Sequence, residues 1–435
     1  MNITRFNLNE QFDEIEKNLQ TCSFIAVDAE FSGLPSLNNK NSLFDSTAQR
    51  YAKLRNGVEG VIFTQVGISA FHYNREKNGY VSTTYNFYLC PSSVGNINQI
   101  CTFQSSALDF LTTHKFDFNK IMYEGIPYLN KCEECMLRRD LNTGDLELLL
   151  DLEHSELLLS CNILNFLFNL FQVSVINTKE SIRGPEDKQN DEDIFVNHCL
   201  GFSRIVKVME KVKKPLVFHN ALTDLLIFFH QFLDPLPTRY ESFKHSVHQT
   251  FPIIYDTKFI SNEMKFIVKK ERFSESTCLA TLYKFFSSSR GLQLALHSPS
   301  ITMKDVFEVT PQFHEAGFDS YCTGYCFIRL CHWSACQLQG SDHVMSSTEH
   351  LNSLKKYCNR INISRAAQLY IVGSLTYVIY IRRLIESEPN FHLMRRDSCL
   401  FLESFDIRRC GGVLEITIVT SIVFLFNKFC AFVPR

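Results

Sequence analysis

The sequence has little net charge, a single tryptophan and no apolar segment at its start. A formal net charge of −2 over 435 residues excludes a polycation, so any contact with nucleic acid has to use a local basic patch. The first ten residues (MNITRFNLNE) lack the apolar region of a secretory signal. Without an export signal, we expect the 16 cysteines to be reduced thiols in the cytosol or nucleus.

The cysteines also lack the regular spacing of a metal-binding or disulfide framework. Cys132 and Cys135 form a lone C-x-x-C pair. A structural zinc site needs two further ligands, usually a second such pair, and none is evident in the sequence. Ordinary reduced thiols are therefore the favoured interpretation of this pair.

The apolar content of 45% is sufficient for a large core, and its pattern predicts an α/β fold. Strands followed by alternating strands and helices indicate a mixed sheet covered by helices. The patterns predict strands over residues 24–31, 61–71, 85–90 and 215–220, a strand end over 253–258, and helices over 10–20, 105–114, 221–233 and 313–338.

The region 138–200 differs from its surroundings and is interpreted as an insertion. Residues 146–171 are strongly apolar but are broken by acidic residues, which favours a packed helix pair over a membrane span. Residues 179–193 are polar and predict a loop.

Two acidic residues at the end of the first long strand are the most informative feature. Asp28 and Glu30 lie two residues apart in the segment FIAVDAEF. Alternate residues of a strand point to the same face, so the two carboxylates project together. Like charges repel at this distance, and a divalent metal with oxygen ligands is the usual solution. A solvated strand end is the alternative for this pair taken alone.

Further acidic residues and a histidine follow in an order that favours catalysis. Asp224 lies one helical turn beyond a strand that ends in His219-Asn220, and Asp256 ends the next strand. His314 and Asp319 are five residues apart in a predicted helix. This order is the layout of a two-metal phosphodiesterase site, in which carboxylates hold two Mg²⁺ ions about 4 Å apart. His314 would accept the proton of the attacking water, since an unperturbed imidazole titrates at a pKa near 6.5.

Together these motifs are similar to the poly(A)-specific ribonuclease family, a DEDDh branch of the RNase H-like 3′–5′ exonucleases. The resemblance spans residues 1 to about 335. It rests on DAEFSG (28–33), QRYAKLR (49–55), NFY (86–88), QSS (104–106), FDFNK (116–120), GIPY (125–128), GFSR (201–204), HNALTD (219–224), DTK (256–258) and HEAGFD (314–319).

The resemblance implies an RNase H-like mixed sheet flanked by helices, with a helical insertion at about 138–200 and a C-terminal extension. The exonuclease domain would cover 1–340 and the extension 341–410. Metal ligation by Asp28, Glu30, a central aspartate and Asp319 is implied, with His314 as the base and two Mg²⁺ ions, or Mn²⁺, as cofactor.

The central aspartate has two candidates in the sequence. In DEDD exonucleases it lies on a helix just after a strand that ends in His-Asn, which favours Asp224. The family also carries an aspartate before Thr-Lys, so Asp256 is the second candidate.

Two differences from the full-length deadenylase indicate which branch of the family the chain resembles. Only about 70 residues separate the GIPY and GFSR segments, without the Arg-x-x-x-His motif of a small nucleic-acid-binding domain, and no RNP-like aromatic strand follows residue 340. This compact layout, together with the segment 42–45, is more similar to the PARN-like proteins that trim the 3′ ends of PIWI-interacting RNA precursors. The resemblance implies a 3′–5′ exoribonuclease of that kind. A poly(A) deadenylase acting on mRNA tails and an inactive RNA-binding adaptor are the alternatives.

The implied partners are a single-stranded RNA 3′ end and an Argonaute/PIWI-type complex that supplies additional grip on the RNA. Relatives often dimerise, so a homodimer is a further expectation. Residues 413–433 form a mostly apolar stretch of 21 residues, about the length of a membrane span, with a terminal core strand as the alternative. We expect a cytoplasmic protein, and a tail anchor would place it on the mitochondrial outer membrane.

Overall fold

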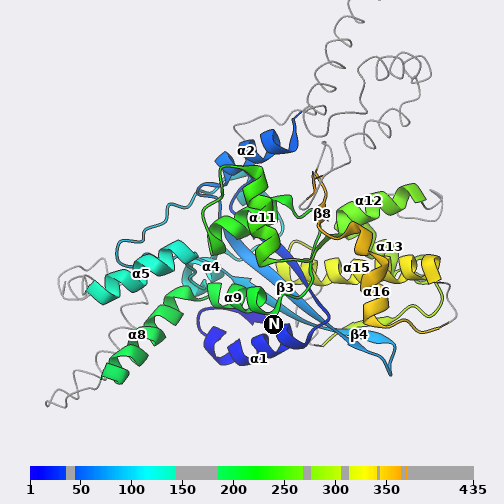
Figure 1. The fold of residues 1–435 in the computed structure, drawn as a ribbon, viewed down its shortest axis with the longest axis horizontal. Coiled ribbons are helices and arrows are strands. Elements are labelled where there is room, and N and C mark those ends of the chain that lie inside the picture. The colour runs from blue at the N-terminus through cyan, green and yellow to red at the C-terminus, as the bar shows by residue number, and fades with distance from the viewer. Residues whose placement is uncertain are drawn as a thin grey trace, which may run out of the picture.

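The computed structural model describes residues 1–35, 45–143, 185–267, 276–304, 313–339, 343–363 and 369–370. One mixed sheet runs through the centre of these residues (Figure 1). Its strands are β1 (Asn2–Ile3), β2 (Phe24–Phe31), β3 (Phe63–Asn74), β4 (Gly79–Tyr88), β5 (Leu216–Phe218), β6 (Ile254–Asp256), β7 (Ser300–Met303), β8 (Arg360–Ile361) and β9 (Leu369–Tyr370).

The strand order is β1-β4-β3-β2-β5-β6-β8-β9, with β7 paired to β4. Strands β2, β3 and β4 are antiparallel neighbours, whereas β2, β5, β6 and β8 run parallel. This order confirms the predicted mixed α/β sheet and places β2 at its centre.

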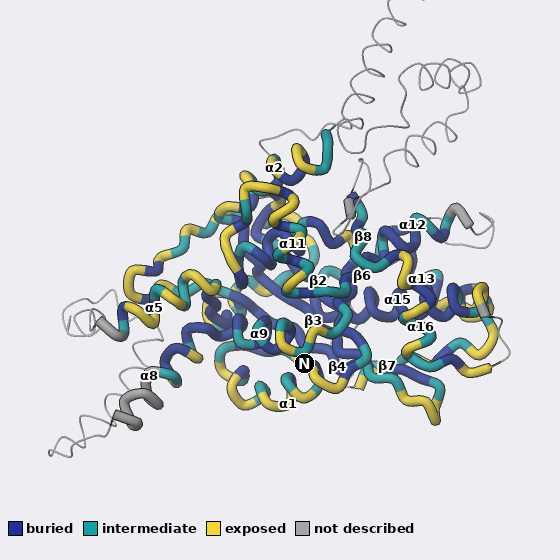
Figure 2. Tube along the Cα trace, in the orientation of Figure 1, coloured by how far each residue is buried: buried dark blue, intermediate teal, exposed yellow. Residues whose placement is uncertain are grey.

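Strand β2 is central because its side chains are apolar on both faces. Ile25 and Val27 belong to one buried cluster, and Phe24 and Ala26 belong to a second cluster on the other face. A strand buried on both sides reads as a continuous apolar run, which is the pattern of FIAVDAEF. The buried residues therefore follow the sheet through the molecule (Figure 2).

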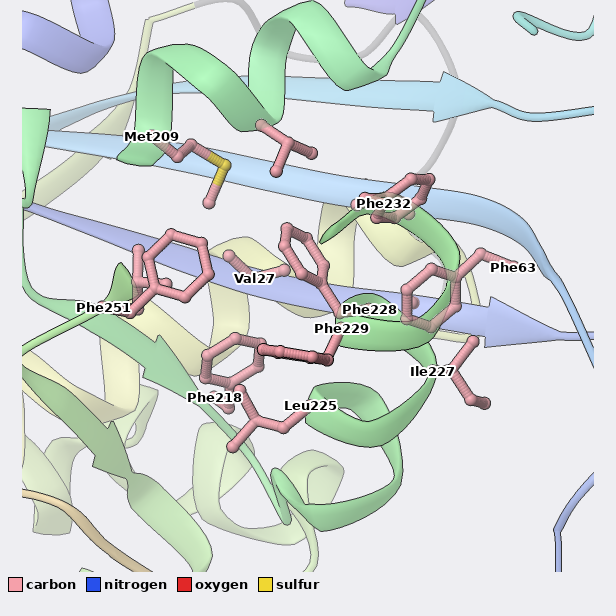
Figure 3. Close-up of a cluster of buried hydrophobic side chains, with 14 of the residues drawn as sticks. Val27, Phe63, Met209, Phe218, Leu225, Ile227, Phe228, Phe229, Phe232 and Phe251 are labelled. Carbon is pink, nitrogen blue, oxygen red and sulfur yellow. The ribbon is translucent and has the colours of Figure 1, made fainter. Parts of the chain in front are cut away.

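The first face is covered by α1 (Leu8–Thr21), α9 (Ser203–Val212) and α10 (Leu222–Phe228), whose buried side chains include Ile15, Met209 and Leu225. Part of this cluster is aromatic, with Phe218, Phe228, Phe229 and Phe232 gathered around Val27 (Figure 3). Each fully buried phenylalanine contributes about 1.5–3 kcal/mol to the stability of the fold. The second face is covered by α12 (Thr257–Ile267), α13 (Leu279–Ser287) and α15 (Ala316–Gln339).

All four predicted helices are present with slightly shifted bounds, and the structure contains further helices. They are α1 (Leu8–Thr21), α2 (Thr47–Val58), α3 (Ser105–Thr113), α4 (Phe118–Glu124), α5 (Lys131–Thr143), α8 (Pro185–Leu200), α9 (Ser203–Val212), α10 (Leu222–Phe228), the π-helical η2 (Phe229–Leu233), α11 (Tyr240–Thr250), α12 (Thr257–Ile267), α13 (Leu279–Ser287), α14 (Ser289–Leu292), α15 (Ala316–Gln339), α16 (Ser347–Ser353) and the 3₁₀ turn η4 (Lys355–Tyr357).

Three boundaries correct the predictions. Strand β4 begins at Gly79, six residues before the predicted strand, because residues 79–84 continue the pairing with β3. The loop predicted over 179–193 is wrong from Pro185 onward, where α8 begins. Proline is compatible with the first turn of a helix. The polar composition of these residues favoured a loop in the sequence, so α8 was not predicted. Helix α15 begins at Ala316, so His314 precedes the helix that was predicted to contain it.

The flanks of the predicted insertion are helical. Helices α5 and α8 share a small apolar cluster that includes Leu137, Phe195 and Val196. Cys132 and Cys135 are exposed free thiols on α5. The helix pair expected at 146–171 lies outside the described residues.

The sheet continues beyond residue 340, because β8 pairs with β6. Most of the predicted extension at 341–410, and all of the segment 413–433, lie outside the described residues. None of the helices that the structure describes is long and apolar enough to cross a membrane.

Candidate active site

Strand β2 brings Asp28 and Glu30 to the face that α15 covers. Both residues share the side of Phe24 and Ala26 through the two-residue repeat of the strand. Glu30 is buried, with 8% of its surface exposed, and Asp28 is partly exposed. The predicted pair therefore lies at the centre of the sheet.

The start of α15 is docked on the neighbouring strand by close backbone contact. Gly67 is the partner of Asp28 across the β2–β3 pair. A Cβ atom on Gly67 would lie 1.8 Å from the carbonyl oxygen of Ala316, so only glycine allows this approach. The backbone of α15 consequently begins directly beside Asp28.

Side chains of the sheet satisfy the first amides of α15. The Ala316 N–H donates to Gln65 Oε1 at 2.8 Å, and the Gly317 N–H donates to Asn86 Oδ1 at 3.1 Å. Both acceptors are fully buried. These N–H groups have no partner within the helix, so the sheet takes the place of a helix cap and fixes where α15 starts.

His314 and Asp319 are joined by the turn that precedes α15. His314 has a φ of 72°, a left-handed conformation, and its N–H donates to Asp319 Oδ2 at 2.9 Å. Ligand atoms of Glu30, His314 and Asp319 all lie within 4.8 Å of one another. The structure thus brings together three residues that are up to 289 positions apart in the chain (319 − 30).

The other oxygen of Asp319 provides a test of whether a cation fits this site. Asp319 is 6% exposed, and within the described residues its buried Oδ1 has no hydrogen-bond partner. An unpaired buried carboxylate oxygen is costly unless a ligand occupies its lone pairs. The carboxylate oxygens of Glu30 and Asp319, including this unsatisfied atom, fit a hard divalent cation.

The raised pKa values of the four carboxylates also favour a bound cation. Burial, followed by the charges of Asp319, Asp224 and Glu30, raises the pKa of Asp28 well above its usual range. Burial and then the charges of Asp319 and Asp224 raise the pKa of Glu30 likewise. Burial is also the main cause that raises the pKa of Asp224 and of Asp319 to about 7.

In the described part of the chain, no lysine or arginine is among the causes of these four shifts. The four carboxylates therefore repel one another without a compensating side-chain cation. A bound metal ion would supply the missing positive charge.

The two candidates for the central aspartate are clearly different in their surroundings. Asp224 lies in the first turn of α10 and is partly exposed. Its charge raises the pKa of Asp28 and of Glu30. Asp256 is fully buried, and its two oxygens accept five backbone N–H groups. Backbone N–H groups occupy its lone pairs, which favours Asp224 over Asp256 as the central metal ligand.

One residue of the site was missed by the sequence analysis. The ring of His114 at the end of α3 lies 3.9 Å from that of His314, centroid to centroid, and Phe110 packs edge-on at 4.8 Å. Burial, and then the charge of His114, lowers the pKa of His314. The signal available was indirect, since the motifs QSS and FDFNK flank α3 but no spacing connects His114 to His314.

Comparison with known proteins shows which family the chain belongs to. The model of the family described as CAF1 family ribonuclease matches residues 3–327. The chain is 36% identical to the pre-piRNA 3′-exonuclease trimmer of Bombyx mori, over 85% of this chain and 78% of that protein. It is 28% identical to the poly(A)-specific ribonuclease PARN of Danio rerio, over 85% of this chain and 65% of that protein.

Among solved structures, the Mg²⁺- and Mn²⁺-bound form of S. pombe Pop2p is similar at a TM-score of 0.43 and 14% identity, over 79% of this chain and 94% of that one. The matched residues include strands β2 to β7 and the four carboxylates of Asp28, Glu30, Asp224 and Asp319. The chain belongs to the CAF1 ribonuclease family and is a 3′–5′ exoribonuclease of RNase H-like fold.

Proposed function

We propose that this chain is a divalent-metal-dependent 3′–5′ exoribonuclease that trims the 3′ ends of small-RNA precursors. The observation that carries the proposal is the cluster of four mutually repelling carboxylates beside His314. Such a cluster destabilises the fold unless a cation binds it, so its presence where α10 and α15 meet the central strand β2 favours a function over a structural role.

Asp28, Glu30, Asp224 and Asp319 would hold Mg²⁺ or Mn²⁺, because carboxylates are the ligands these ions prefer. When bound, two such ions supply the Lewis acidity that activates water and stabilises the leaving oxygen of a phosphodiester. The side chains of the protein fix where this happens. The Asp319 carboxylate also holds the turn that presents His314.

His314 would accept a proton at an imidazole nitrogen. Its lowered pKa keeps the ring neutral near pH 7, which is the form that accepts a proton. The packed rings of His114 and Phe110 restrict its orientation. Fixing a catalytic group in this way lowers the entropic cost of reaching the reactive geometry.

The substrate is proposed from the relative with 36% identity, whose name describes a trimmer of piRNA precursors. A single-stranded RNA 3′ end is the direct partner. An Argonaute/PIWI-type protein that holds the remainder of the RNA is the proposed second partner. Homodimerisation and attachment to the mitochondrial outer membrane through residues 413–433 are further proposals, tested by light scattering and by flotation with liposomes.

The test compares two RNAs labelled at the 5′ end. One is a mixed-sequence RNA bound by a PIWI-type protein with a protruding 3′ extension, and the other is a free poly(A) chain. Stepwise shortening of the bound RNA to the edge of the PIWI protein, lost in Asp28→Ala, supports the proposal. Faster shortening of poly(A) would identify a deadenylase instead. RNA binding without hydrolysis, with and without metal, would identify the inactive adaptor.

A further inference from the structure

Asp256 is the meeting point of several chain segments at the carboxyl ends of the parallel strands. It is fully buried at the end of β6, next to β5 on one side and β8 on the other. Its Oδ1 accepts the N–H groups of Asn220 (2.9 Å), Lys258 (2.9 Å) and Phe259 (3.2 Å), and its Oδ2 accepts those of Ala221 (3.2 Å) and Asn362 (2.8 Å).

Two of these bonds fix the turn that carries Asp224. Asn220 and Ala221 connect the end of β5 to the start of α10, and Asp224 follows within the first turn of that helix. Asn220 has a φ of 74°, a conformation that non-glycine residues rarely adopt. Because a strained turn persists only when its surroundings hold it, Asp256 determines where Asp224 lies.

Asn362 contacts this turn directly as well as through Asp256. It follows β8 and its backbone N–H donates to Asp256. Its side-chain Nδ2 donates to Asn220 Oδ1 at 2.8 Å, and its Oδ1 accepts from Asn262 Nδ2 at 3.2 Å. One residue from the C-terminal part of the sheet therefore bridges the turn before Asp224 to α12.

We propose that Asn362 is a positioning residue for Asp224, and that β8 completes the metal site although it follows the family-matched segment. The proposal rests on the proposed function, since it requires Asp224 to be a metal ligand. Asn362 acts through Asn220 and Asp256, both of which it contacts by hydrogen bonds. Groups that hydrogen-bond a metal ligand directly typically change metal affinity by about 10- to 100-fold when removed, and Asn362 acts one contact further away, so the lower figure applies.

The test is Mn²⁺ binding, measured by calorimetry and by electron paramagnetic resonance without RNA, together with thermal unfolding. Asn362→Ala removes both side-chain bonds and keeps the backbone bond to Asp256. We expect its Mn²⁺ affinity to fall about tenfold. In the trimming assay at fixed Mn²⁺, we expect kcat to fall while KM for RNA stays near that of the unchanged protein.

Asn359→Gly is the matched control, since it loosens the same strand at its other end. Asn359 Oδ1 accepts from the Ile254 N–H and its Nδ2 donates to the Pro252 carbonyl, both at 2.9 Å. Its φ of 58° suits glycine. This variant should lower the unfolding temperature about as much as Asn362→Ala, with Mn²⁺ affinity within about twofold of the unchanged protein.

Asn220→Gly removes the acceptor of the same bond, tolerates the φ of 74° and replaces Asn362→Ala if that variant fails to fold. If the hydrogen bond between Asn362 and Asn220 causes the loss of affinity, the double variant of Asn220→Gly and Asn362→Ala binds Mn²⁺ no more weakly than the single variant with the lower Mn²⁺ affinity. Equal losses in Asn359→Gly and Asn362→Ala, or unchanged Mn²⁺ affinity in Asn362→Ala, would overturn the positioning role. Unchanged Mn²⁺ affinity in Asp224→Asn would overturn the metal assignment itself, which separates the two failures.

Discussion

Replacing Asp319 by asparagine removes one charge from the acidic site while keeping an oxygen that can accept the His314 N–H. Burial raises the pKa of Asp319 from 3.8 to about 7. Each unit of pKa corresponds to about 1.4 kcal/mol, so the charge destabilises the metal-free fold by at most about 4 kcal/mol at pH 8. We therefore expect metal-free Asp319→Asn to be more stable than the unchanged protein and to be inactive.

The pH dependence has a defined sign. The unfolded chain releases the Asp319 proton near pH 4, whereas the folded protein retains it until about pH 7. Between these values the unfolded state binds fewer protons, so the free energy of unfolding falls as the pH rises. The gain in Asp319→Asn should be absent at pH 4, grow across this window and level off above pH 7.

Asp256→Asn is the matched comparison, because it changes another buried aspartate with the opposite expectation. The five N–H groups around Asp256 leave no acceptor for an amide NH₂, which would face at least two of them. Lost hydrogen bonds to a charged group cost about 1.5–3 kcal/mol each. Urea unfolding at pH 5 and pH 8 measures both variants. Destabilisation of both at pH 8 would refute the argument that the buried charge of Asp319 destabilises the metal-free fold.

Three further predictions follow from the site. Mn²⁺ should raise the unfolding temperature more at pH 8 than at pH 5, because the carboxylates lose protons between these values; equal shifts in a fluorescence melt would contradict this. Gly67→Ala should lower stability by about 1–3 kcal/mol and reduce activity, since its Cβ would clash with Ala316; an unaltered circular dichroism melt would argue against the close docking. His114→Ala should lower kcat about tenfold with Mn²⁺ affinity unchanged, and His114→Phe should restore part of it; equal rates in all three proteins would exclude a role for the ring packing.

The parts of the fold that the sequence predicts well are those with local causes. Strand β2 was predicted with its observed bounds because FIAVDAEF is a continuous apolar run, and the two-residue repeat places Asp28 and Glu30 on one face. The mixed sheet followed from the alternation of strands and helices. The family match confirms the exonuclease fold that the motifs implied.

The features that the sequence does not predict depend on contacts between residues that are not adjacent in the chain, which a local sequence pattern does not show. His314 was assigned to a helix because its neighbours continue the apolar pattern, whereas its left-handed backbone depends on the bond to Asp319. The sequence leaves Asp224 and Asp256 open as alternatives because both lie near strand ends, and burial and the five backbone donors around Asp256 separate them in the structure. Strand β8 has two residues, too few for a periodic signal, and it is defined by pairing with β6.

The most direct test of the central claim is the length of a 5′-labelled single-stranded RNA over time, with the unchanged protein and Asp28→Ala compared in Mn²⁺ and in a chelator. A metal-dependent exonuclease shortens the RNA stepwise from its 3′ end, and both the chelator and Asp28→Ala abolish the ladder. Undiminished shortening by a folded Asp28→Ala, or cleavage within the RNA, would contradict the assignment of the acidic cluster as the active site.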